Sequence, residues 1–269
     1  MEYNVNSLDS VCAALAQTLG IDTPACAAAP NADLLSFAKA AFEGGRADRI
    51  FMYNPDAIAQ WIDEKYAAFM PEVHKYAGLR LPLCSVMPSV TPVCFGTMYT
   101  GAQPAVHGIR SYTKPVIKID SLFDAVIRSG KRAAIIGDTQ CSMMHIYLER
   151  NMEYFGYETL AEINAKAIEL ICGDEYDLIC VYNGNFDSTM HGFGPESPLA
   201  LAELRQNSHT FGVFTQLIQR KWQQHNTLIG FAMDHGCHEI DGQHGSHGLD
   251  MTEDLNICHY YTAFKAVQP

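Results

Sequence analysis

Residues 227–250 have the sequence TLIGFAMDHGCHEIDGQHGSHGLD. Residues 227–232 are apolar and typical of a buried strand, and the eighteen residues that follow contain four histidines and three aspartates. Ligands of open α/β sheets collect outside the carboxyl ends of the strands. Imidazole and carboxylate groups together are ligands of zinc, manganese and iron. This stretch therefore predicts a divalent-metal site at the carboxyl edge of a parallel sheet; the alternative interpretation is a flexible His-rich loop.

Apolar runs and helical patterns alternate along the rest of the chain. The expected strands are 49–53, 132–137, 177–182, 227–232 and 256–265. The expected helices are 7–19, 32–43, 57–70, 119–130, 159–172 and 197–222. This alternation predicts an α/β fold with a mostly parallel central sheet and helices on both faces. We expect residues 1–269 to form one domain with residues 1–45 as a helical N-terminal preface, and the proline-rich residues 71–90 to be irregular.

Composition excludes several classes of protein. The 269 residues are 48% hydrophobic and carry a formal net charge of −12, which argues against disorder and against binding to a nucleic acid polymer. The nine cysteines are odd in number, which favours reduced thiols in a cytoplasmic protein. The first residues lack the pattern of a signal peptide, and no apolar run reaches the length of a bilayer span, so no membrane partner is expected.

Two other expected strands are followed by metal-binding residue types. Asp56 follows strand 49–53, although an aspartate at this place is also typical of a helix N-cap. Asp187 and His191 lie four residues apart after strand 177–182, in a segment that is rich in glycine and proline and that we expect to be a loop. A carboxylate and an imidazole at this spacing can converge on one ion; a polar surface loop is the alternative.

Thr91 lies at the expected start of a helix. It precedes Pro92, and proline is favoured at the first helical position, so we expect Thr91 to be the helix N-cap. At that place its hydroxyl lies at the positive end of the helix, where backbone N–H groups can receive an anion. A simple capping threonine is the alternative.

In combination, these segments resemble the alkaline phosphatase superfamily, and most closely its nucleotide pyrophosphatase/phosphodiesterase branch. The matching elements are, in chain order, Asp56, Thr91, TGAQPAVHGI at 100–109, Asp187 with His191, Asp234-His235-Gly236 and His247-Gly248. The resemblance extends over about residues 48 to 256. Each motif alone is only moderately specific, but their order and their places at strand ends make the combination strong.

The resemblance implies two divalent metal ions as cofactors, with zinc as the first choice and manganese as the alternative. The implied ligands of one ion are Asp187, His191 and His247. The implied ligands of the other are Asp56, Asp234, His235 and the Thr91 oxygen.

Several histidines compete for the late ligand position. His247 lies in GSHGLD, which resembles the G-x-H-G-x-D element of the family, and is preferred. His244 is also followed by glycine and is the alternative. We expect His238 to face solvent or to support a ligand from behind, and His107 to have a structural role in its turn.

The resemblance implies an enzyme: a metal-dependent hydrolase of phosphodiesters, nucleotide pyrophosphates or related small phosphorylated compounds, acting through a phospho-threonine at Thr91. Thr91, Cys94 and Asn183 are the expected substrate contacts. Cys94 departs from the branch, which has an asparagine three residues after the nucleophile, and Asn185 is the alternative to Asn183 as a donor.

Other functions on this scaffold are alternatives to a phosphodiesterase. A phosphomonoesterase or phosphonate hydrolase can use the same scaffold, and a non-catalytic metal-binding homologue is a further alternative. A sulfatase is disfavoured because that branch needs Cys or Ser where this chain has Thr91. Only about forty residues separate His191 from Asp234, so we expect no inserted cap over the site.

Overall fold

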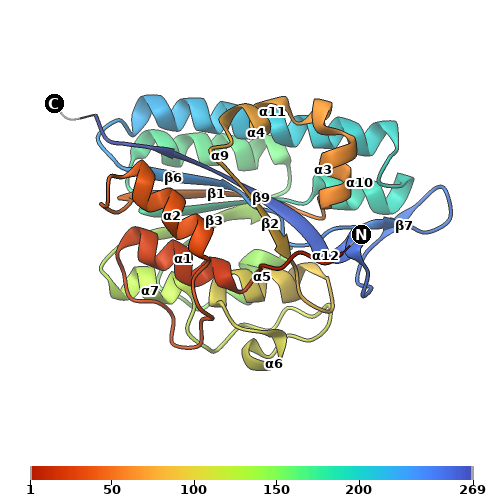
Figure 1. Ribbon diagram of the computed structural model, residues 1–269, viewed down its shortest axis with the longest axis horizontal. Coiled ribbons are helices and arrows are strands. Elements are labelled where there is room, and N and C mark those ends of the chain that lie inside the picture. The colour runs from red at the N-terminus through yellow and green to blue at the C-terminus, as the bar shows by residue number, and fades with distance from the viewer. Residues whose placement is uncertain (1, 268–269) are drawn as a thin grey trace.

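The computed structural model describes residues 2–267, which form a seven-stranded central sheet (Figure 1). Its strands are β1 (Arg49–Pro55), β2 (Leu79–Cys84), β3 (Ala133–Asp138), β4 (Glu153–Tyr157), β5 (Leu178–Asn183), β6 (Thr227–Phe231) and β9 (Asn256–Phe264). The strand order is β2-β9-β6-β1-β5-β3-β4. Strands β6, β1, β5, β3 and β4 pair in parallel, whereas β9 runs antiparallel to both neighbours. The predicted mostly parallel α/β sheet is confirmed.

Helices cover both faces of this sheet (Figure 1). One face carries α3 (Gln60–Lys65), α4 (Pro71–Tyr76), α9 (Leu160–Gly173), α10 (Asn185–Phe193) and α11 (Pro198–Lys221). The other carries α1 (Ser10–Leu19), α5 (Thr91–Thr100), α6 (Pro104–His107), α7 (Leu122–Arg128) and α8 (Ser142–Ile146). Helix α2 (Ala32–Ala41) packs on α1, on the edge strand β2 and on its neighbour β9. In the chain, three short elements come after β6 and before β9: β7 (His238–Glu239), β8 (Gly245–Ser246) and α12 (Thr252–Leu255).

Local sequence signals fix the ends of several helices. Thr159 accepts a hydrogen bond from the backbone of Glu162, whose carboxylate accepts one in return from the Thr159 backbone, so α9 begins at a capping box. Gly20 ends α1 in the left-handed conformation, with φ 68°, which glycine adopts without a steric penalty. These signals explain why both helices lie close to where the sequence predicts them.

Helix α1 belongs to the main core of the molecule. Leu15 and most of its other side chains are buried, and the helix packs against α2, α5 and α7. Just before it, Ser7 forms a parallel bridge with Cys84 at the end of β2. The residues expected to form a helical preface therefore contribute to the same hydrophobic cluster as Phe51 in the central strand β1.

The prediction that residues 71–90 are irregular is wrong, because they contain α4 and β2. Strand β2 lies at the edge of the sheet, where the missing N–H of Pro82 does not break a ladder on both sides. Leu81 and Leu83 alternate with more exposed residues, as expected for an edge strand. The expected helix 57–70 is also divided, into α3 and a 3-10 turn at Ala67–Phe69.

Candidate metal centre

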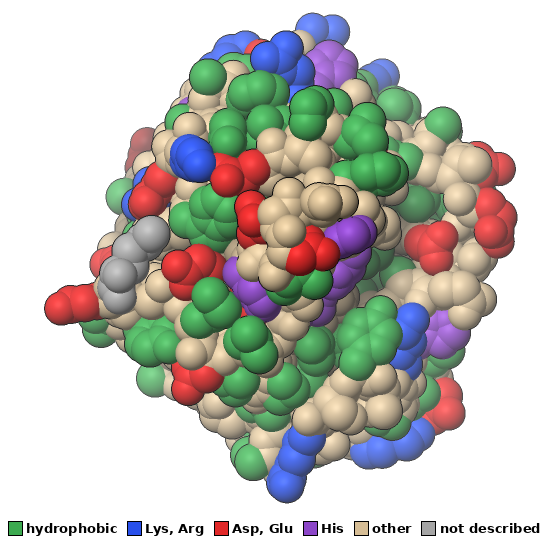
Figure 2. Space-filling model, turned by 90° about the vertical axis from the view of Figure 1, so that its right-hand side faces the viewer, with side chains coloured by type: hydrophobic (Ala, Val, Ile, Leu, Met, Phe, Trp, Pro, Cys, Tyr) green, Lys and Arg blue, Asp and Glu red, His purple; other side chains and the backbone are tan. Residues whose placement is uncertain are grey.

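The carboxyl ends of β5, β1 and β6 lie side by side at one edge of the sheet. Asp187 follows β5, Asp56 follows β1, and Asp234 and His235 follow β6. Figure 2 shows that histidine and acidic side chains gather near the middle of the corresponding face of the molecule. The topology therefore brings together side chains that are far apart in the sequence.

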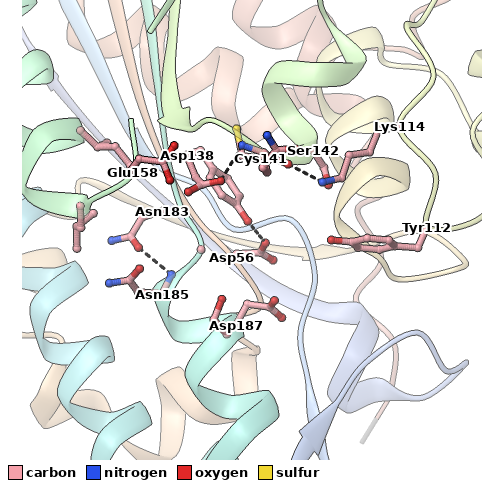
Figure 3. Close-up of a pocket in the computed structure, with 16 residues that line it drawn as sticks. Asp56, Tyr112, Lys114, Asp138, Cys141, Ser142, Glu158, Asn183, Asn185 and Asp187 are labelled. Atoms are coloured by element: carbon pink, nitrogen blue, oxygen red, sulfur yellow. Dashed lines mark hydrogen bonds between the residues drawn. The ribbon is translucent and has the colours of Figure 1, made fainter. Parts of the chain in front are cut away.

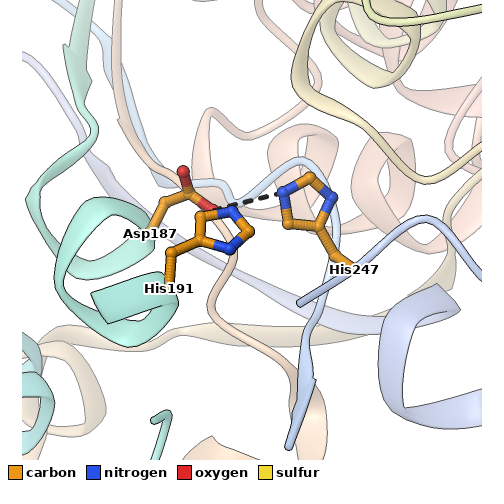
Figure 4. A group of neighbouring side chains, drawn as sticks. All are labelled: Asp187, His191 and His247. Carbon is orange, nitrogen blue, oxygen red and sulfur yellow. Dashed lines mark ion pairs between the residues drawn. The ribbon is translucent and has the colours of Figure 1, made fainter. Parts of the chain in front are cut away.

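Asp187, His191 and His247 form the first of two groups (Figure 4). Their nearest ligand atoms all lie within 4.8 Å of one another. The Nε2 atoms of His191 and His247 are 3.3 Å and 3.4 Å from Oδ1 of Asp187. The three side chains come from α10 and from the loop after β8, and they face a common point.

Asp56, Asp234 and His235 form the second group, which is buried. Nε2 of His235 lies 3.3 Å from Oδ1 of Asp56 and 3.4 Å from Oδ2 of Asp234. The two groups adjoin, since the ring centres of His235 and His247 are 4.1 Å apart. This is the same division of six side chains that the sequence resemblance implies.

Three buried carboxylate oxygens in these groups have no hydrogen-bond donor among the described residues. They are Oδ1 of Asp56, Oδ1 of Asp187 and Oδ2 of Asp234. Buried polar atoms are nearly always paired, and an unpaired one is costly. Each of these oxygens faces an imidazole nitrogen of its own group. A divalent cation in each group would satisfy these oxygens, and the mixed imidazole and carboxylate donors fit an ion of the zinc or manganese type.

The three histidines of the two groups are oriented in the same way. Their Nδ1–H groups donate to backbone carbonyls, His191 to Gly245 at 2.9 Å, His247 to Ser89 at 2.8 Å and His235 to Gly236 at 2.9 Å. A carbonyl can only accept, so Nδ1 carries the proton and Nε2 is left with a free lone pair. This is the typical support of a metal-binding histidine.

The charges of the groups are unbalanced when no cation is bound. Burial raises the pKa of Asp56 to about 7, and the negative charge of Asp187 adds to this effect. Burial and the charge of Asp56 raise the pKa of Asp234 well above its ordinary value. Burial lowers the pKa of His235 to about 3, so its ring is neutral at physiological pH. Burial thus opposes ionisation of both carboxyl groups, and the neutral His235 ring supplies no positive charge, so a cation is what would favour their ionised forms.

These pKa shifts predict that zinc stabilises the chain more at pH 8 than at pH 6. A folded-state pKa of about 7 against 3.8 for free Asp means that Asp56 contributes full stability below about pH 4 and loses it as pH rises through 7. The metal-free chain is therefore weaker at pH 8, and protons compete less with the ion there. Thermal unfolding with and without zinc measures this; an equal rise in Tm at both pH values contradicts the prediction.

Thr91 is the first residue of α5, and the prediction that it is the N-cap is wrong. The N-cap is Val90, whose extended backbone (φ −131°, ψ 146°) has no capping side chain. The Thr91 hydroxyl is thereby free to point toward the second group. It lies 3.3 Å from Oδ2 of Asp56 and 3.5 Å from Nε2 of His235. It remains at the positive end of the helix, as expected.

The segment after β5 is helical, and the expectation of a loop there is wrong. Helix α10 runs from Asn185 to Phe193, with Asp187 and His191 one turn apart on the same side. Gly194 ends the helix with φ 85°, so the glycines that suggested a loop lie at its end. A helix holds the two side chains more rigidly than a loop does.

The other candidate histidines lie outside both groups. His244 is exposed and its Nδ1 contacts Asp241 at 2.7 Å, so the structure brings His247 and not His244 to the first group. His238 is buried and contacts Asp254 at 2.7 Å, so the expectation that it faces solvent is wrong. His107 packs on Gly96 and lies 3.0 Å from the Thr97 hydroxyl, which is a structural contact.

Two of the expected substrate contacts are occupied by other partners. Cys94 is fully buried, where its sulfur accepts from Ser85 at 3.2 Å, so it does not face an open pocket. Asn183 donates to Tyr53 at 2.7 Å and accepts from the Asn185 backbone at 3.0 Å. The alternative, Asn185, has an exposed side chain and lines a pocket beside the centre.

This pocket has a volume of about 280 Å³ and opens next to Asp56 and Asp187 (Figure 3). Sequence reasoning missed most of its lining residues, and three of the missed side chains matter for the site: Tyr112, Lys114 and Tyr182. Tyr182 donates to Oδ2 of Asp56 at 2.5 Å and so orients that carboxylate. Tyr112 and Lys114 come from the irregular segment between α6 and α7. None of the three has a sequence signal, because only the fold brings them to the pocket.

Gly236 is required by the close packing behind His235. A Cβ atom built on it lies 2.2 Å from the Glu253 carbonyl oxygen and 2.9 Å from Cβ of Ala59. We expect Gly236→Ala to lower the free energy of unfolding by about 1–3 kcal/mol, the usual cost of overpacking, and to weaken zinc binding. Gly173→Ala is the control, since its Cβ meets nothing within 4 Å. Equal melting temperatures for the two variants would refute this packing argument.

No helix among the described residues has the length and apolar character needed to span a membrane. All nine cysteines are free thiols.

Comparisons with known proteins place the fold. No family model matches the chain. Human ectonucleotide pyrophosphatase/phosphodiesterase family member 7 is 33% identical over 72 residues, which are 27% of this chain and 16% of that protein. The solved structure of mouse ectonucleotide pyrophosphatase/phosphodiesterase 5 aligns with a TM-score of 0.58 and 19% identity, over 72% of this chain and 58% of that one. The human counterpart aligns over the same shares with a TM-score of 0.57 and 18% identity.

A third solved structure is an inactive threonine-to-alanine variant of the mouse protein in complex with AMP, with a TM-score of 0.57, 18% identity and the same coverage. The chain spans 58% of the length of these solved relatives. The resemblance to nucleotide pyrophosphatase/phosphodiesterases predicted from the sequence is confirmed at the level of the fold.

Proposed function

We propose that this chain is a metal-dependent phosphoric ester hydrolase that acts on phosphodiesters, nucleotide pyrophosphates or related small phosphorylated compounds. The observation that carries the proposal is the position of the Thr91 hydroxyl at the start of α5. It lies beside two adjoining Asp/His groups whose inward carboxylate oxygens have no donor. A nucleophile, an anion-favouring helix end and two cation sites at one point are the parts that phosphoryl transfer needs.

The first group would hold one divalent ion and the second group the other, and we propose zinc in both. Bound there, the ions supply positive charge for the phosphate oxygens and lower the pKa of coordinated oxygen nucleophiles. Thr91 would attack phosphorus through Oγ1, and the alcohol of the ester would leave. The dry surroundings of Asp56 and Asp234 strengthen these electrostatic effects. Water would then hydrolyse the phospho-threonine and restore the free hydroxyl.

The relatives support this proposal through their printed descriptions. The mouse structure in complex with AMP is an inactive variant in which a threonine is replaced by alanine. This agrees with an essential threonine in a fold of this type and with a small phosphorylated nucleotide as the class of ligand. The cytoplasmic location indicated by the free cysteines stays a prediction.

Hydrolysis assays with and without metal test the proposed function. Purified protein is treated with a chelator, and turnover of bis-p-nitrophenyl phosphate, p-nitrophenyl phosphate and ATP is measured before and after zinc or manganese is restored. We expect chelation to abolish turnover and one of the metals to restore it. The proposal is contradicted if turnover survives chelation, or if the metal-loaded protein hydrolyses none of the three compounds.

A further inference from the structure

The pocket beside the metal centre has a strongly uneven charge. Its lining includes four carboxylates, those of Asp56, Asp138, Glu158 and Asp187, and a single basic residue, Lys114. Two of the carboxylates belong to the metal groups. Oxygens of Asp138 and Glu158 accept hydrogen bonds from the Gln140 backbone and from Thr139. Lys114 forms no ion pair within residues 2–267, so its charge is available to a ligand.

Tyr112 and Lys114 lie on the same wall of this pocket. Figure 3 shows the Tyr112 hydroxyl pointing across the pocket toward Asp56, with Lys114 beside it. The ammonium group of Lys114 lies 5.8 Å from the centre of the Tyr112 ring. A phenol hydroxyl is protonated at neutral pH and can donate a hydrogen bond. The wall therefore offers one neutral and one charged donor opposite the carboxylates of the metal centre.

The segment that carries these residues is held in place at several points. The Lys114 ammonium donates to the Gln140 carbonyl oxygen at 2.5 Å, which ties it to the end of β3. The Thr113 backbone donates to the Ser111 carbonyl at 2.7 Å in a tight turn. Ile117, which is buried, donates to the Ile146 carbonyl at 2.8 Å. These contacts keep the wall near the centre without a bound ligand.

We propose that Tyr112 and Lys114 bind the phosphate oxygens of the substrate opposite the metal groups, and that Lys114 favours substrates with a second negative charge. This inference rests on the proposed function and names its substrate class more closely. Of the earlier candidate donors, Cys94 is buried outside the pocket lining, and Asn183 lines the pocket but donates to Tyr53. In a chain of net charge −12, a lysine at this place is the local positive charge that an anionic substrate needs.

The two residues differ in what they recognise. The Tyr112 hydroxyl can donate to an oxygen that every phosphate ester has, so its effect does not depend on the class of ester. Lys114 is a positive charge and interacts more strongly with a doubly charged phosphate. A phosphomonoester or a nucleotide pyrophosphate carries more negative charge than a simple diester. Lys114 therefore sets the preference between these classes.

The test compares Lys114→Met, Lys114→Arg and Tyr112→Phe, with Lys118→Met as the matched control. Lys118 lies on the same segment but pairs with Glu149 at 2.5 Å, outside this pocket. For the zinc-loaded protein, kcat/KM is measured on p-nitrophenyl phosphate and bis-p-nitrophenyl phosphate. The affinity for inorganic phosphate is measured by calorimetry.

We expect Lys114→Met to lower kcat/KM for the monoester about ten- to hundredfold and for the diester clearly less, as loss of a charged hydrogen bond predicts. It should weaken phosphate binding to a similar extent, whereas Lys114→Arg retains most of both. Tyr112→Phe should lower kcat/KM for both esters to a similar degree. Lys118→Met should leave all values unchanged.

The inference about Lys114 is wrong if Lys114→Met has the same kcat/KM values and phosphate affinity as Lys118→Met. It is also wrong if Lys114→Met lowers kcat/KM equally for the two esters. If Tyr112→Phe has no effect on either ester or on phosphate binding, the role of Tyr112 is wrong. A wild-type protein that binds metal but hydrolyses neither ester counts against the proposed function. Phosphate affinity still decides the inference in that case, since it needs no turnover.

Discussion

Replacing Thr91 by alanine should lower kcat for phosphoester hydrolysis by at least about a thousandfold, the scale on which loss of a nucleophile acts. The Thr91 hydroxyl is almost fully buried and lies within hydrogen-bond distance of Asp56 and His235. No other described hydroxyl contacts both of these side chains. The measurement is kcat on the best of the test esters, with metal content determined on the same sample.

Thr91→Ser is the matched control, because it keeps the hydroxyl and removes only a methyl group. It should retain far more activity than Thr91→Ala. Both variants should bind zinc, since the carboxylates and imidazoles of the two groups are untouched. Wild-type turnover in a metal-loaded Thr91→Ala protein would show that Thr91 is not the nucleophile.

Replacing Asp234 by asparagine should abolish hydrolysis and yet stabilise the metal-free chain. Asp234 is fully buried, its Oδ2 has no donor, and burial raises its pKa well above the ordinary value. An amide of the same shape stays neutral at every pH and offers an NH₂ group to the unpaired Oδ1 of Asp56. Oδ1 of Asp234 accepts from the Ala57 backbone at 3.3 Å, and an amide oxygen keeps this contact.

We expect the metal-free Asp234→Asn variant to unfold at a higher temperature than metal-free wild type at pH 8. A gain of about 1 kcal/mol corresponds to about 2–4 °C for a chain of this size. Added zinc should raise its Tm much less than that of wild type, because one carboxylate ligand is lost. Function thus costs stability in the metal-free state. This expectation is contradicted if the metal-free variant has a lower Tm than metal-free wild type. It is also contradicted if zinc raises the Tm of the variant as much as that of wild type.

Asp241→Asn is the control for Asp234→Asn. Asp241 is exposed and contacts His244, outside both groups. The substitution removes the same charge from the chain, but it should change neither metal binding nor hydrolysis.

The site was predictable from sequence to the extent that its residues follow strands. Asp56 and Asp234 come directly after apolar runs, and parallel topology sends the ends of such runs to one edge. Helix α10 was not predicted, because Gly192, Gly194 and Pro195 near its end resemble a loop. Tertiary packing against α11 and β8 decides that segment.

Other parts of the structure have weak local signals. Strand β4 (EYFGY) is an edge strand with half-exposed residues, so it lacks the apolar run that marks β5. Strand β2 contains a proline, which argues against a strand except at an edge. Tyr112 and Lys114 lie in an irregular segment with no periodicity, and only the fold places them against Asp56. Residues whose role depends on such long-range placement cannot be identified from sequence patterns.

The most direct test of the central claim is the zinc content of the wild-type chain, measured by elemental analysis after loading and dialysis. The two Asp/His groups predict two ions per chain, one for each group. Asp187→Asn and Asp234→Asn should each retain about one. A wild-type protein that retains no zinc or manganese under these conditions would contradict the account, because the unpaired carboxylate oxygens of both groups would then have another explanation.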